Sequence, residues 1–76
     1  MIKELDTVVL VKDLKEYQLK PGDVGAVVHV YEGGKAYEVE FVAGEGKTIA
    51  VVTLPAGDVR AMQRADILHV SAYAPA

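Results

Sequence analysis

Glycine-rich turns divide this chain into short runs of β-branched and apolar residues, and this division most constrains its fold. The clearest run, AYEVEFV, places Tyr37, Val39 and Phe41 on one face and Glu38 and Glu40 on the other. Because side chains alternate across a β-strand, we expect a half-buried antiparallel strand with one wet face. A slip of one residue would bury two carboxylates, so the register of this strand is strongly specified.

Four other runs have the length and composition of strands. The predicted strands cover residues 6–12, 24–31, 36–42, 47–54 and 58–62, with a single 3₁₀ turn before the last. A further run, 67–70, is interpreted as either a sixth short C-terminal strand or an edge extension. Short, closely spaced strands predict a small all-β, five-stranded antiparallel barrel over residues 1–71, with 72–76 as a flexible tail.

Four glycines and one aromatic residue are expected to shape this barrel. Gly22 follows a proline in a predicted turn, and Gly33 with Gly34 is the clearest hairpin signal in the chain. Gly25 lies inside the second predicted strand, where a glycine marks a bulge, a sharp bend or a close backbone approach. Phe41, the only phenylalanine, is predicted to lie in the core.

The alternation expected for the second strand also assigns its histidine to a side. Strict alternation places Val27, His29 and Tyr31 on one side of the strand. Ala26, Val28 and Val30 then lie on the opposite side.

Composition limits both location and partners. The chain has no cysteine, which excludes disulfides and thiolate metal sites and favours a reducing, cytoplasmic setting. Eleven acidic residues against eight basic ones give a net charge of −3 and a pI of about 5.2. This balance argues against nucleic acid and anionic membranes as partners. No apolar run has the length needed to span a bilayer.

No catalytic constellation is visible among the polar residues. Ser71 is the only serine and lies near the C-terminus. Glu38 and Glu40 are paired carboxylates, but a solvated strand face explains them and spacing places no third ligand beside them. His29 and His69 are far apart in the chain and lie in no recognised ligand pattern. We therefore expect neither an enzyme nor a bound cofactor or metal.

Three residues are candidates for contact with a protein partner. Tyr17 and Leu14 lie in the long first loop, and Tyr31 ends the second predicted strand. Loop and strand tyrosines can line a groove for an extended peptide. The alternative is that Tyr17 packs its ring on the barrel and points its hydroxyl at water.

Three segments resemble a known family: LKPGDVGAVVHVY, AYEVEF, and TL followed by DVR. They are similar to short prokaryotic proteins described only as a domain of unknown function, over residues 2–71. The resemblance implies an SH3-like barrel and transfers no catalytic residue. The stretch PGDVGAV is also similar to the SH3-like barrels of the nitrile hydratase β-subunit and of KOW domains. The nitrile hydratase likeness implies partner binding, because the metal of that enzyme is on its other subunit.

We therefore expect a non-enzymatic protein-interaction module that self-associates into a homo-oligomer. With 51% hydrophobic residues in so small a chain, some apolar surface must stay uncovered by the monomer. One alternative is a KOW-like nucleic-acid-binding barrel that uses Lys12, Lys15 and Lys20. The other is a small-molecule or cation-binding domain that uses Glu38, Glu40 and a histidine.

Overall fold

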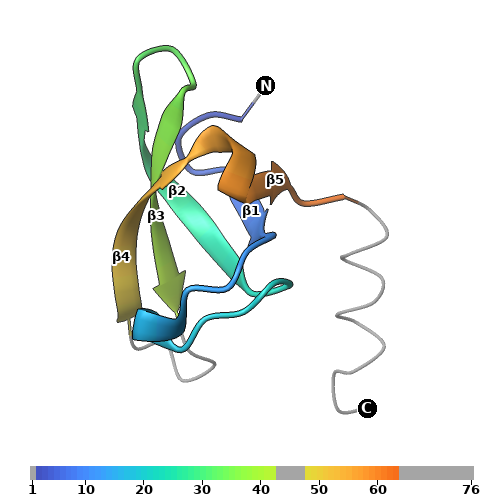
Figure 1. The fold of residues 1–76 in the computed structure, drawn as a ribbon. Helices are drawn as coiled ribbons and strands as arrows, with labels where there is room; N and C mark the ends of the chain where they lie inside the picture. Colours follow the sequence, from blue (N-terminus) through green and yellow to red (C-terminus); the bar gives the residue numbers. More distant parts are fainter. Residues whose placement is uncertain (1, 43–47, 64–76) are drawn as a thin grey trace, which may run out of the picture.

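The computed structural model describes residues 2–42 and 48–63, which form an all-β chain (Figure 1). The 3₁₀ turn η1 (Lys15–Tyr17) lies in the loop after the first strand, and η2 (Ala56–Asp58) leads into the last. The 3₁₀ turn predicted before the last strand is thus confirmed. The strands are β1 (Thr7–Leu10), β2 (Val24–Tyr31), β3 (Ala36–Val42), β4 (Thr48–Pro55) and β5 (Val59–Ala61).

All five strands belong to one antiparallel sheet with the order β4-β3-β2-β1-β5. β2, β3 and β4 form a meander, whereas β5 returns to pair with β1 on the other side (Figure 1). Within residues 2–42 and 48–63, β4 and β5 are therefore the two edges. The prediction of an all-β domain with five antiparallel strands is confirmed. The predicted hairpin loop at 43–46, the sixth strand at 67–70 and the tail at 72–76 lie outside the described residues.

One apolar core joins the two halves of the sheet. Both edge strands, β4 and β5, place side chains in it, so the sheet curls around a common interior instead of lying flat. Phe41, with 1% of its surface exposed, is the largest fully buried side chain. The core consists of Val8, Leu10, Leu19, Val27, Tyr37, Val39, Phe41, Val52, Leu54 and Val59.

A β-bulge in β2 changes which side chains face the core. The pairing of β2 with β3 shifts between Val27 and His29, so Val28 is an extra residue on the β2 side. Val27 is fully buried and Val30 packs against the core, whereas Val28 and His29 are exposed. The prediction that Val27 shares a side with His29 and Tyr31 is wrong. The bulge shifts the period of two by one residue halfway along the strand.

Gly25 marks a close approach between β2 and β3. A Cβ atom at this position would lie 2.6 Å from Cγ1 of Val39 and 2.9 Å from the backbone oxygen of Glu40. The bulge, one of the alternatives weighed for this glycine, lies at Val28 instead. A side chain at Gly25 would push the two strands apart.

Glycine is also needed in the turn that joins β2 to β3. Gly33 and Gly34 have φ values of +68° and +105°, a region that other residues enter only with strain. Gly22, with φ of +99°, lies in the turn before β2 and donates its N–H to the Leu10 carbonyl at 2.8 Å. These turns set where β2 begins and ends.

Candidate interaction surface

The outer side of β4 is the least protected edge of the sheet. Among the described residues β4 pairs only with β3, so its other side has no strand partner there. Its eight residues, TIAVVTLP, include no charged side chain, and Ile49 and Val51 are each 48% exposed. Natural sheets usually protect an edge with charge, proline or a short strand. β4 has proline only at its last residue and is therefore open to pairing.

The alternation of the β3–β4 ladder identifies which backbone groups face this open edge. The Ala56 N–H donates to the Lys35 carbonyl at 3.0 Å and continues the register of the ladder. Because hydrogen-bonded pairs alternate along antiparallel strands, Leu54, Val52 and Ala50 bond to β3 within the regular part of the ladder. The N–H and C=O groups of Val51 and Thr53 therefore point away from β3, toward the free edge.

Hydroxyl groups hold the carboxylates on the outer face beside β4. The Tyr31 hydroxyl donates to Oε1 of Glu38 at 2.7 Å, and the Thr48 hydroxyl donates to Oε2 of Glu40 at 2.9 Å. The hydrogen bond to Glu38 raises the pKa of Tyr31, because an ionised phenol would lose that bond and face a negative carboxylate. Both carboxylates are thus engaged by side chains of their own sheet.

The cation-site alternative gains no support from this face. The ring of His29 meets the ring of Tyr31 edge-on at 4.3 Å, and His29 Nδ1 lies 3.7 Å from Oε2 of Glu4. Within residues 2–42 and 48–63, no group of three or more histidine or acidic side chains has an arrangement that could hold a metal ion. His69 lies outside the described residues.

The structure places the three predicted partner-binding residues at two separate locations. Tyr17 ends η1 and is 37% exposed, while Leu14 is partly buried against the core and bridges to Leu19. Tyr31 ends β2 beside the hairpin, at the opposite end of the domain from η1 (Figure 1). Tyr17 and Leu14 are therefore neighbours in one loop, and Tyr31 belongs to the outer face near β4.

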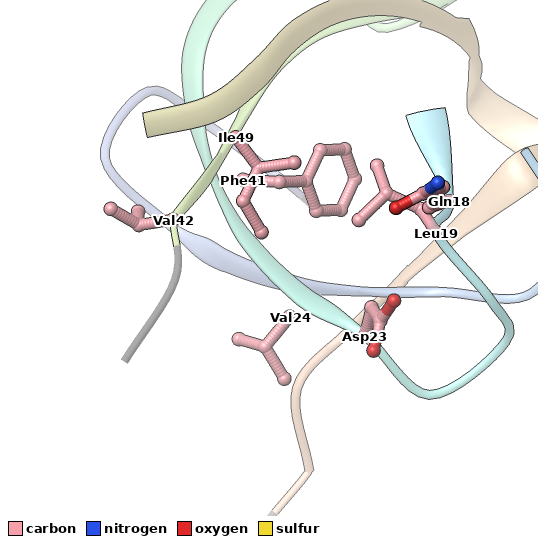
Figure 2. Close-up of a pocket in the computed structure, with 7 residues that line it drawn as sticks. All are labelled: Gln18, Leu19, Asp23, Val24, Phe41, Val42 and Ile49. Atoms are coloured by element: carbon pink, nitrogen blue, oxygen red, sulfur yellow. The ribbon is translucent and has the colours of Figure 1, made fainter. Parts of the chain in front are cut away.

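A small hollow lies beside the start of β4 (Figure 2). Its volume of about 130 Å³ is below the roughly 300–1,000 Å³ of ordinary small-molecule sites. The Asp23 carboxylate at its rim accepts a hydrogen bond from the Lys20 N–H at 2.9 Å. The hollow has room for about one side chain, and its lining mixes apolar side chains with Gln18 and the Asp23 carboxylate. It is lined by Gln18, Leu19, Asp23, Val24, Phe41, Val42 and Ile49.

The lysines considered for nucleic-acid binding lie in the loop between β1 and β2. Lys12 Nζ is 3.6 Å from Oδ2 of Asp58, so this charge is partly compensated. Lys15 precedes Glu16 in η1, and the exposed Lys20 lies in the turn before β2. The loop is thus of mixed charge, which disfavours phosphate binding.

These features define a small all-β domain with five antiparallel strands and an open edge at β4. A family model described as "Domain of unknown function (DUF4926)" matches residues 4–61, and the chain belongs to that family. The expected membership of a family of unknown function is confirmed. Neither the curated proteins nor the solved structures give a significant match. No helix in the described part of the chain is long and apolar enough to cross a membrane.

The open edge is the feature that reasoning from the sequence did not identify. The signal was present, because the run 48–55 has no charge whereas the run 36–42 has two carboxylates. An uncharged strand can equally lie in the middle of a sheet, as β2 does. Only the strand order distinguishes a covered run from an open one.

Proposed function

We propose that this protein is a non-enzymatic protein-interaction module that binds an extended strand along the free edge of β4. The supporting observation is an uncharged edge strand whose Val51 and Thr53 backbone groups point away from the sheet. Addition of a strand to an open edge is a common recognition mode, in which main-chain hydrogen bonds provide affinity. The hollow beside Ile49 would accept one side chain of the added strand.

We also infer that the fold is an SH3-like barrel. The strand order, the long loop between β1 and β2 and the 3₁₀ turn before β5 support this assignment. The likeness to the nitrile hydratase β-subunit barrel supports partner binding instead of chemistry. A cytoplasmic setting is proposed because the chain contains no cysteine.

Peptide selection with a charged edge variant tests the proposed function. Peptides of the length of β4 are selected from a displayed random library for binding to the native chain. Their affinities for the native chain and for the Val51→Lys variant are then compared. A charge on an edge strand blocks strand addition, so affinity is expected to fall by about tenfold or more. Val28→Lys is the matched control, because Val28 is similarly exposed (42%) but lies on β2, which has strands on both sides.

Loss of binding in Val51→Lys but not in Val28→Lys supports the proposal. Equal binding to both variants would place the binding site elsewhere and overturn it. Failure to select any peptide would also contradict it. Circular dichroism of both variants separates lost binding from lost folding.

A further inference from the structure

We propose that the strand bound at this edge is β4 of a second copy of this chain, paired antiparallel about a two-fold axis at Val52. This inference rests on the proposed function, because it uses the same free edge. It predicts a homodimer whose sheet continues from one copy into the other.

The limits of the regular part of β4 place the axis. The β3–β4 ladder is irregular where β3 ends, beside Ile49. At the other end Pro55 has no N–H to offer. The regular stretch between them is 50–54, and its midpoint is Val52. A two-fold axis at this residue lets both copies use the whole regular stretch.

An axis at Val52 also pairs the open backbone groups of the two copies. Val51 of one copy lies opposite Thr53 of the second copy, and the N–H and C=O groups of both residues face the free edge. Val51 and the opposite Thr53 therefore exchange two backbone hydrogen bonds. The two-fold axis generates a second, identical pair, Thr53 with Val51 of the second copy. Val51 and Thr53 also become cross-strand neighbours, a favourable contact between β-branched side chains.

The distribution of charge makes the second copy a suitable occupant. Two chains of net charge −3 repel each other, so they associate best where no charge faces the contact. β4 is such a place. The nearest acids of the sheet, Glu38 and Glu40, lie one strand further from the axis, paired with Thr53 and Val51. Glu40 of one copy and Glu38 of the second copy are separated by three strand spacings, about 14 Å. This distance is beyond the Debye length of about 8 Å, so their repulsion is largely screened.

Sedimentation equilibrium over a concentration series up to about 1 mM tests this inference. The native chain is expected to show a reversible monomer–dimer equilibrium. Val51→Lys should raise the dissociation constant about tenfold or more, because the symmetry brings two ammonium groups close to the axis. Val28→Lys should leave it unchanged. By NMR, the Val51 and Thr53 amides should exchange more slowly with solvent as the concentration rises.

A chain that stays monomeric throughout the series would overturn the inference. The proposed function would still stand if selected peptides bind and Val51→Lys abolishes that binding. A dimer that survives Val51→Lys, or one that protects neither the Val51 nor the Thr53 amide, would show that the copies meet at another surface. That result overturns the inference as well.

Discussion

In the described part of the chain, β4 and β5 form the two edges of one sheet, yet they differ in length, charge and surroundings. β4 has eight residues and no charge, whereas β5 has three, with Arg60 at its centre. Asp58, just before β5, pairs with Lys12 at 3.6 Å, so charge surrounds the short edge. Among the described residues, β5 pairs only with β1 and β4 only with β3.

Burial does not account for this difference, because both edges are anchored in the same core. Leu54 of β4 and Val59 of β5 are each almost fully buried. The difference concerns what an approaching strand would meet. At β5 the approaching strand would meet a short edge flanked by charges. At β4 it would meet a longer, uncharged edge with the outward backbone groups of Val51 and Thr53. Because β5 is protected and β4 is not, strand pairing with another chain is directed to β4.

The largest loss of stability is expected from truncating Phe41, the core side chain of β3 that lies next to β4. Phe41 lies opposite Ala50 of β4 and is 1% exposed, so Phe41→Ala should cost about 3–5 kcal/mol of unfolding free energy. Val59→Ala, in β5 itself, should cost less, about 1.5–3 kcal/mol. Urea unfolding measures both. A mild effect of Phe41→Ala would contradict its place in the core.

Two proline variants test which backbone groups of β4 are free. Val52→Pro removes an N–H that bonds to β3, whereas Val51→Pro removes one that faces the open edge. Val52→Pro should therefore cost about 1–3 kcal/mol more, because it leaves a carbonyl of β3 without its donor. Val52→Ala provides the correction for lost core packing. Equal costs after that correction would mean that the ladder has the opposite alternation.

At the other edge, removal of the Lys12–Asp58 pair should have a small effect. The Lys12 side chain is 59% exposed, so Lys12→Ala should cost about 0.2–1 kcal/mol. The cost should shrink at high ionic strength, because salt screens an exposed pair. Urea unfolding at low and high salt measures it. A large cost that salt leaves unchanged would show that Lys12 stabilises the β5 edge through packing.

The smallest expected effect appears only in alkaline solution, on the outer face beside β4. The pKa of Tyr31 is raised in the folded chain, so its stabilising bond to Glu38 is fully present below the ordinary value of 10.0. This contribution is lost as the pH rises through the raised pKa. Tyr31→Phe should therefore lose stability less steeply above about pH 10. Parallel pH profiles for both chains would contradict this.

The sequence predicted the regular parts of the sheet well and failed where strand pairing departs from regularity. The alternating run 36–42 became β3 as expected, with Phe41 in the core. The alternation of β2 failed at Val28, because a bulge depends on how two strands pair and has no local signature in one of them. Gly25 carried the signal of close approach, while the bulge came three residues later.

By itself, the sequence determined the all-β class, the antiparallel meander and the turns, because alternation and glycine act on neighbouring residues. The tertiary structure alone decided that β5 returns to β1 and that β4 becomes an edge. It also decided that Val51 and Thr53 present their backbone groups outward. These outcomes depend on contacts between residues far apart in the chain, which no local pattern records.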